Sequence, residues 1–188
     1  PGLSTLTAIL LVGATLVAPV HAIDPERLAA YLRAHVAPFS GPLVVRQYQG
    51  GQSNPTYRIT AGDQSYVLRR KPPGTLLPSA HAVDREYRVM RALAATGVPV
   101  PRMLALCEDD SVLGTAFYVM EYVRGRVLWD PTLPGMTREQ RAAHYDELNR
   151  VIATLHNVDF AAIGLADYGR PGQYVERQIA RWSKQYAA

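Results

Sequence analysis

The chain has few residues that could link segments covalently or gather a metal ion through sulfur. It contains one cysteine, Cys107, among 188 residues. A single cysteine excludes an internal disulfide and a thiolate metal cluster. Because Cys107 closes the apolar run Met103–Cys107, we expect a buried structural thiol rather than a nucleophile.

A concentrated basic surface is also missing, although the formal net charge is +4. The longest basic run is Arg69–Lys71, and no stripe of basic residues alternates with aromatic ones. We therefore expect no nucleic-acid partner. A composition of 48% hydrophobic and 19% charged residues, without internal repeats, is typical of a globular protein.

The segment Leu3–Ala22 contains no Asp, Glu, Lys or Arg. Its apolar run follows the pattern of a signal peptide, but no basic residues precede it and the chain begins with Pro1. Three interpretations stay open: an export signal, an extraneous start, or a helix that is buried or rests on a membrane, because the run is marginal for spanning. Residues 1–22 are thus expected to be a leader-like or extraneous segment before globular sequence that starts at Ile23.

Turn signals and side-chain periodicity beyond this segment predict an α+β arrangement. Asp24 and Pro25 begin a helix that reaches about Ala37, and Val83–Gly97 forms a second helix. Five β-patterned runs are expected to form an antiparallel sheet with this second helix. These runs are Leu43–Tyr48, Tyr57–Thr60, Ser65–Arg70, Met103–Glu108 and Ala116–Val123.

Helical patterns dominate after Gly125. Thr137 is expected to cap a long helix through about Asn157, and Val175, Ile179 and Trp182 indicate a last short helix. The sequence therefore predicts a bilobal plan, with a small lobe at residues 23–123 and the start of a helical lobe at residues 124–188.

Two glycines, Gly50 and Gly51, join the first two strands. Glycine lets a turn close over an anion with its backbone N–H groups exposed, and Ser53 and Asn54 would add side-chain donors. A plain hairpin turn would use the same residues. The setting between strands excludes the dinucleotide and Walker-type interpretations, because both need a helix directly after the glycines.

The third strand supplies a candidate cation. Side chains alternate along a strand, so Val67 and Arg69 share one face, with Arg69 beside phosphate and Val67 on the adenine. Glu86 lies at the margin of the buried face of the following helix and can reach the sheet. An ion pair with Glu86 would fix the Arg69 rotamer, whereas the alternative is an exposed arginine and a solvated glutamate.

The run Phe117–Gly125 passes from an apolar strand into glycine and is typical of a hinge. The Glu121 carbonyl and the Val123 amide would bind adenine, with Met120 limiting the depth of the pocket. The alternative is an edge strand that ends in a turn.

Together these motifs resemble the aminoglycoside phosphotransferase and choline kinase-like family, nearest the branch associated with acyl-CoA dehydrogenases. The resemblance covers Ile23–Tyr186 and implies a protein-kinase-like fold with Arg69 where many relatives have lysine. It also implies ATP-dependent phosphorylation of a hydroxyl on a small metabolite. Aminoglycoside, choline, sugar and hydroxyacyl acceptors stay open, and the branch favours the last. Use of ATP indicates the cytoplasm unless residues 3–22 are a genuine signal. The strings that carry the resemblance are Gly50–Asn54, Tyr66–Gly74, Ser79–Tyr87, Val98–Pro101, Tyr118–Tyr122 and Asp167–Gly172.

The catalytic loop of that family is not found in this sequence. The family uses a His-Gly-Asp loop. Its Asp orients or deprotonates the acceptor hydroxyl, and an Asn five residues later binds magnesium. None of the five histidines here is followed by Gly-Asp, and His144 lies inside a helical pattern. We therefore expect no catalytic or metal-binding residue in the chain, magnesium ligands beyond residue 188, and negligible transfer by this polypeptide alone.

The expected site is the nucleotide side of a phosphotransferase, with a small-molecule hydroxyl acceptor bound elsewhere. Two other classes stay open: a non-catalytic, pseudokinase-like nucleotide-binding module, and a secreted binding domain with a kinase-like shell. The residues expected to bind ATP are Gly50, Gly51, Gln52, Ser53, Asn54, Val67, Arg69, Glu86, Met120, Glu121 and Val123.

Overall fold

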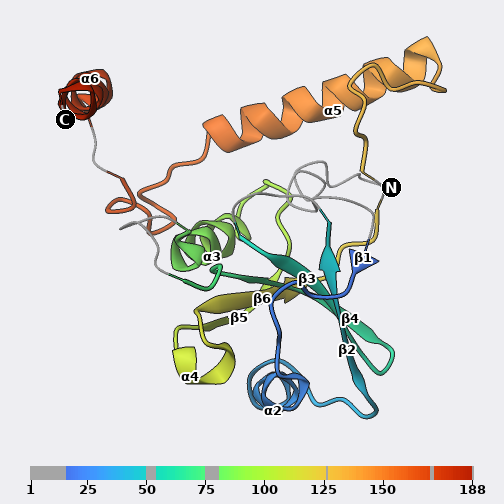
Figure 1. The fold of residues 1–188 in the computed structure, drawn as a ribbon. Coiled ribbons are helices and arrows are strands. Elements are labelled where there is room, and N and C mark those ends of the chain that lie inside the picture. The colour runs from blue at the N-terminus through green and yellow to red at the C-terminus, as the bar shows by residue number, and fades with distance from the viewer. Residues whose placement is uncertain (1–15, 50–53, 75–80, 126, 170–171, 188) are drawn as a thin grey trace. The chain divides into compact units, whose positions relative to one another are not determined.

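The computed structural model describes residues 16–49, 54–74, 81–125, 127–169 and 172–187. Its contacts divide the chain into two units, residues 1–158 and residues 159–188. The first unit is built on an antiparallel sheet with helices on both faces (Figure 1). Its strands are β1 (Leu16–Val17), β2 (Leu43–Tyr48), β3 (Thr56–Ala61), β4 (Gln64–Arg70), β5 (Met103–Cys107) and β6 (Phe117–Glu121), in the spatial order β1-β2-β3-β4-β6-β5.

One strand more is present than the sequence predicts. All five expected strands form, and Leu16–Val17 adds a sixth by pairing with β2, so that Leu16 lies opposite Tyr48. The backbone N–H of Val20 also donates to the side chain of Gln47 at 2.8 Å. The prediction of five strands missed this sixth one, because a two-residue pairing has no alternating pattern to detect. The earlier part of the leader-like segment, residues 1–15, lies outside the described residues.

The helices of this unit are α2 (Pro25–His35), α3 (Val83–Leu93), α4 (Asp110–Leu113) and α5 (Arg138–His156). Helices α2 and α5 begin at the capping residues that the sequence predicts, whereas α3 begins after Ala82 without a side-chain cap. Asp24 accepts the backbone N–H groups of Glu26 and Arg27 at 2.9 and 3.1 Å, and Thr137 forms a capping box with Gln140. The short α4 lies between the fourth and fifth predicted strands, and the Asp109 side chain accepts the N–H of Ser111 at its start.

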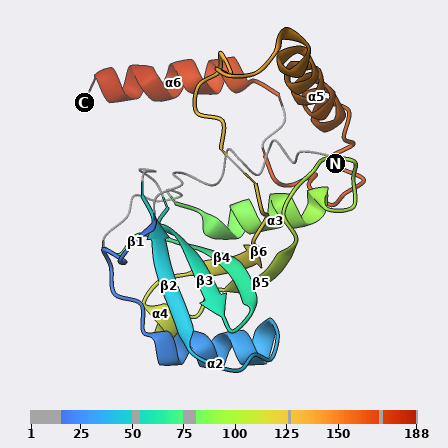
Figure 2. The same ribbon diagram turned by 90° about the vertical axis from the view of Figure 1, so that its right-hand side faces the viewer.

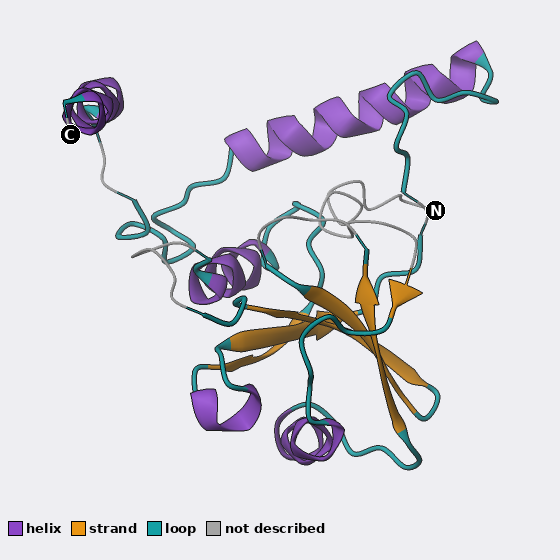
Figure 3. Ribbon diagram, viewed as in Figure 1, coloured by secondary structure: helices purple, strands orange, loops and turns teal. Residues whose placement is uncertain are grey.

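Helices α2 and α3 lie on opposite faces of the sheet (Figures 1, 2 and 3). Side chains of β4 alternate between the two faces: Tyr66 and Leu68 pack in the cluster that contains the α2 residues Leu28 and Leu32, whereas Val67 packs in the cluster that contains α3 residues. Strand β4 is therefore buried on both faces. This arrangement places Arg69, which follows Leu68, on the α3 side.

The β3–β4 turn requires glycine at position 62. Gly62 has φ +61°, and a Cβ there would lie 2.8 Å from the backbone oxygen of Ser40. We expect Gly62→Ala to lower the free energy of unfolding by about 2–3 kcal/mol, because a positive φ and a backbone clash add together. Urea denaturation measures this change.

Gly114→Ala is the matched control, since Gly114 also has a positive φ of +83° but no atom within 4 Å of the Cβ position. Gly114→Ala should lower the free energy of unfolding by about 1 kcal/mol, because only the unfavourable positive φ contributes. Equal losses in the two variants would contradict the role of the Ser40 contact.

Residues 159–188 form the second unit, whose helix is α6 (Tyr174–Tyr186). Its apolar side chains Val175, Ile179 and Trp182 occur at helical spacing and are exposed. In the described parts of the chain, no helix combines the length and apolar character needed to cross a membrane.

Candidate functional site

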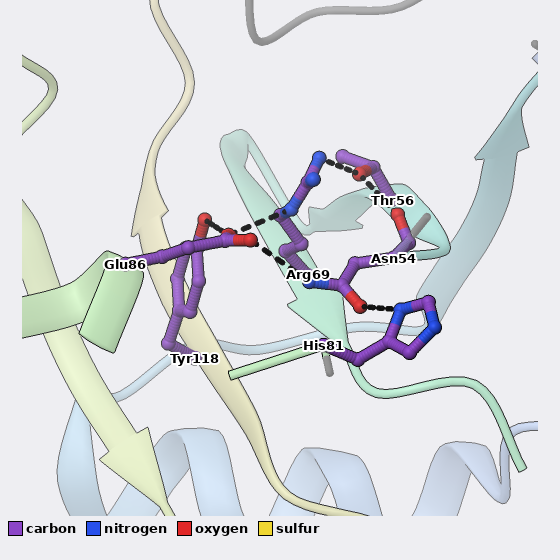
Figure 4. A network of polar contacts seen from close by, with 6 residues as sticks. All are labelled: Asn54, Thr56, Arg69, His81, Glu86 and Tyr118. Atoms are coloured by element: carbon purple, nitrogen blue, oxygen red, sulfur yellow. Dashed lines mark hydrogen bonds and ion pairs between the residues drawn. The ribbon is translucent and has the colours of Figure 1, made fainter. Parts of the chain in front are cut away.

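Arg69 of β4 and Glu86 of α3 form an ion pair across the α3 side of the sheet (Figure 4). The distance from Arg69 Nε to Glu86 Oε2 is 2.8 Å, and the two side chains are 13% and 31% exposed. The Nε–H group does not point at the carboxylate well enough to be a hydrogen bond, so charge attraction makes the contact. The structure thus brings together the cation and the carboxylate that the sequence singled out.

Two buried polar residues, Thr56 and Asn54, connect Arg69 back to Glu86 and so complete a ring of polar contacts around this pair. Arg69 Nη1 donates to Thr56 Oγ1 at 3.1 Å, and the Thr56 hydroxyl donates to the backbone oxygen of Asn54 at 3.2 Å. Asn54 Nδ2 then donates to Glu86 Oε1 at 2.8 Å. Asn54 and Thr56 are each 5% exposed, so these contacts satisfy groups that water reaches poorly.

Tyr118 of β6 provides a further donor to the carboxylate. Its hydroxyl donates to Glu86 Oε2 at 2.9 Å. Burial raises the pKa of Tyr118, and the negative charge of Glu86 raises it further. Tyr118 therefore keeps its proton well above neutral pH and acts only as a donor to Glu86.

The ring fixes the guanidinium plane of Arg69. Its Nε lies 2.8 Å from Glu86 Oε2 in an ion pair and its Nη1 donates to Thr56, so the group is held by two neighbours. Nη2 takes part in neither of these two contacts. An arginine held in this way can present the remaining donor and its charge to an anion such as a phosphate.

The glycine turn and the adenine contacts are less fully described. Gly50, Gly51, Gln52 and Ser53 lie outside the described residues, and their roles stay predictions. Val67 and Met120 lie opposite each other in the β4–β6 register and are each 1% exposed. Neither offers free surface to a base in this conformation, so adenine binding by these two side chains also stays a prediction.

At the end of β6, Glu121 is tied to Arg102. Its Oε1 accepts the Arg102 backbone N–H at 2.9 Å, and its own backbone N–H donates to the Arg102 oxygen at 3.0 Å. Val123 follows in the loop after β6 and is partly buried. The adenine contacts expected from the Glu121 carbonyl and the Val123 amide are untested.

Sequence reasoning missed three members of the network: Thr56, Tyr118 and His81. Thr56 lies directly opposite Arg69 in the antiparallel register, so counting back from the β3–β4 turn could have found it. Tyr118 lies two residues before Met120 and therefore on the same face of the strand, so side-chain alternation could have placed it at the site. His81, whose Nδ1 lies 2.9 Å from Asn54 Oδ1, comes from a loop without periodicity and had no such signal.

Magnesium ligands stay unassigned among the described residues. No group of three or more His, Cys, Asp and Glu side chains that could hold a metal ion occurs in those parts of the chain. We derive no metal-dependent step from this chain.

The sheet, the helix α3 and the Arg69–Glu86 pair define the class as a protein-kinase-like small lobe. The whole arrangement is similar to the crystal structure of a Ralstonia eutropha JMP134 protein assigned as an aminoglycoside phosphotransferase. The TM-score is 0.75 at 57% identity, and the match covers 88% of this chain and 48% of that one.

The chain belongs to the phosphotransferase enzyme family known as APH, whose sequence profile matches residues 44–188. It is 49% identical over 168 residues to mouse acyl-CoA dehydrogenase family member 10, a match that covers 89% of this chain and 16% of the relative. It is 44% identical over 176 residues to human acyl-CoA dehydrogenase family member 11, covering 92% of this chain and 23% of the relative. The chain thus spans less than a quarter of either relative.

Proposed function

We propose that this chain forms the ATP-binding portion of a phosphotransferase that acts on a hydroxyl of a small metabolite. The observation that carries the proposal is the guanidinium of Arg69, which Glu86 and Thr56 hold beside the end of the glycine turn. Family membership supports phosphoryl transfer as the chemistry. In such a site a fixed cation stabilises the negative charge of the phosphates.

The proposed site divides into three groups of residues. The first group would hold the phosphates and consists of Gly50, Gly51, Gln52, Ser53 and Arg69. The second would contact the adenine and consists of Val67, Met120, Glu121 and Val123. Glu86 and Asn54 would act mainly by orienting Arg69, because the Asn54 amide already donates to Glu86.

The acceptor class follows from the relatives by analogy. A hydroxyacyl compound suits a family branch named for acyl-CoA dehydrogenases, and an aminoglycoside suits the solved relative. We favour the hydroxyacyl class. Magnesium would be bound together with ATP, through ligands that we do not assign to this chain.

A non-catalytic nucleotide-binding module is the second candidate function. Within these 188 residues no histidine is followed by Gly-Asp, so this candidate needs only the nucleotide-binding residues of the chain. Such a module would use the same nucleotide site without transferring phosphate. The coding sequence beyond Ala188 separates the two candidates: an open frame that encodes a His-Gly-Asp loop would support the phosphotransferase, and a stop codon would support the binding module.

The test of the nucleotide site is a calorimetric titration of ATP against the 188-residue chain and its Arg69→Ala variant. We expect the variant to bind ATP at least about tenfold more weakly, because the charge-assisted contact to phosphate is lost. The ATP affinity of Arg69→Lys should fall between the two, since lysine keeps the charge but lacks the planar guanidinium whose donors point in fixed, separate directions.

Arg46→Ala serves as the control, because Arg46 is an exposed arginine on β2 of the same sheet. Its affinity for ATP should equal that of the unmodified chain. Equal affinities of the unmodified chain and the Arg69→Ala variant would remove Arg69 from the site. A folded unmodified chain that does not bind ATP would overturn the proposed function.

A further inference from the structure

His81 lies in the loop before α3 and contacts Asn54, the residue that follows the glycine turn. Its Nδ1 lies 2.9 Å from Asn54 Oδ1 (Figure 4), and its side chain is partly buried. Its backbone has φ +58°, and its carbonyl accepts the N–H of Val83, the first residue of α3. No role assigned above uses this residue.

The direction of the His81–Asn54 hydrogen bond follows from the neighbouring contact. Asn54 Nδ2 donates to Glu86 Oε1 at 2.8 Å, which orients the amide and leaves Oδ1 facing His81. An amide oxygen can only accept, so Nδ1 of His81 must carry the hydrogen. Both the charged imidazole and its Nδ1–H tautomer meet this requirement, and the neutral Nε2–H tautomer does not.

We propose that His81 is a positioning residue for the phosphate-binding cation, acting through Asn54 and Glu86 on Arg69. Asn54 is 5% exposed, so removal of the His81 donor would leave its Oδ1 without a partner in a place that water reaches poorly. The Asn54 amide would then be held at one end only. The hydrogen bond from Asn54 Nδ2 to Glu86 Oε1 would weaken, and the Glu86 carboxylate would then fix the position of Arg69 less well.

The chain of contacts is continuous from loop to cation. It runs from His81 Nδ1 to Asn54 Oδ1, from Asn54 Nδ2 to Glu86 Oε1, and from Glu86 Oε2 to Arg69 Nε, at 2.9, 2.8 and 2.8 Å. Each link joins a different segment: the loop before α3, the end of the β2–β3 turn, α3 and β4. These contacts therefore link the position of the His81 loop to the guanidinium of Arg69.

Two substitutions at position 81 distinguish the loss of the hydrogen-bond donor from the effect of backbone strain. Asparagine and glycine both tolerate a positive φ, so neither adds backbone strain. Asparagine places an N–H donor where the imidazole has Nδ1, whereas glycine has no donor. His81→Asn should bind ATP within about twofold of the unmodified chain, and His81→Gly should bind it about five- to tenfold more weakly.

The effect on ATP rests on the proposed function, but the hydrogen bond itself can be tested without nucleotide. Nitrogen-15 NMR of the histidine side chains of the unmodified 188-residue chain should show neutral His81 as the Nδ1–H tautomer. Asn54→Ala should shift His81 towards the Nε2–H form, which free histidine prefers. A merely space-filling His81 would show no dependence of its tautomer on Asn54.

The outcomes are distinguishable. Absence of ATP binding by the unmodified chain would overturn the proposed function, while the tautomer still tests the contact. ATP binding by His81→Gly that equals that of the unmodified chain would overturn the positioning role and leave the proposed function standing. An Nε2–H tautomer in the unmodified chain, or equally weak binding by His81→Asn and His81→Gly, would overturn the donor role of Nδ1.

Discussion

Replacing Glu86 by alanine should lower the free energy of unfolding by about 2–3 kcal/mol and weaken ATP binding at least about tenfold. The carboxylate accepts hydrogen bonds from Tyr118 and Asn54 and faces the charge of Arg69. Its removal leaves two donors and one cation without their acceptor. Because Asn54 is 5% exposed and Arg69 is 13% exposed in its side chain, water replaces the lost carboxylate incompletely. The pair is partly exposed on the Glu86 side, which keeps the loss below that of a fully buried ion pair.

Urea denaturation and ATP titration of the same preparations measure both effects. Glu86→Gln keeps an acceptor oxygen without the charge, so its losses should be smaller than those of alanine. Asp146→Ala replaces an exposed carboxylate of α5 and should change the unfolding free energy by less than about 0.5 kcal/mol. If Glu86→Ala matched the Asp146 variant in both measurements, the carboxylate would not organise the site.

The second large effect is expected at Leu68, in the middle of β4. Leu68 is fully buried and packs on the α2 side of the sheet, in a cluster with Leu32 and Phe117. Leu68→Ala removes buried methyl groups and leaves a cavity, which lowers the free energy of unfolding by about 3–5 kcal/mol. A loss of this size is a large part of the stability of an ordinary domain.

The measurement is again the urea midpoint, with Val44→Ala of β2 as the control. Val44 is 44% exposed, so its truncation should lower the unfolding free energy by less than about 1 kcal/mol. Similar losses at positions 44 and 68 would contradict the burial of β4 on the α2 side of the sheet. Since β4 carries Arg69, the Leu68 variant should also lose ATP binding at denaturant concentrations that the unmodified chain tolerates.

The sequence predicts those parts of the fold that local periodicity and capping determine. The strands that contain Leu68 and Tyr118 form where side-chain alternation predicts them, and α2 begins at Asp24 and Pro25 as expected. The pairing of Arg69 with Glu86 was also predicted, because alternation fixes the face of the strand and helical spacing fixes the face of the helix.

Contacts that depend on loops could not be predicted in this way. The His81–Asn54 hydrogen bond joins residues 27 positions apart and requires a positive φ at a residue other than glycine. The pairing of Leu16 with Tyr48 needs long-range placement of a two-residue strand. Neither contact leaves a period or a turn signature in the sequence, so only the three-dimensional arrangement reveals them.

The two-residue strand β1 has a consequence for how this lobe behaves at high concentration. A strand at the edge of a sheet exposes unpaired N–H and C=O groups that can recruit a strand from another molecule. β1 covers Gln47 and Tyr48 of β2, while the exposed Arg46 places a charge on the part of β2 that β1 leaves open. The opposite edge, β5, has a register irregularity between Met103 and Ala105, which interrupts a regular pairing surface. The same chain without its first 22 residues would therefore uncover more of the β2 edge and aggregate more readily through strand-to-strand contacts.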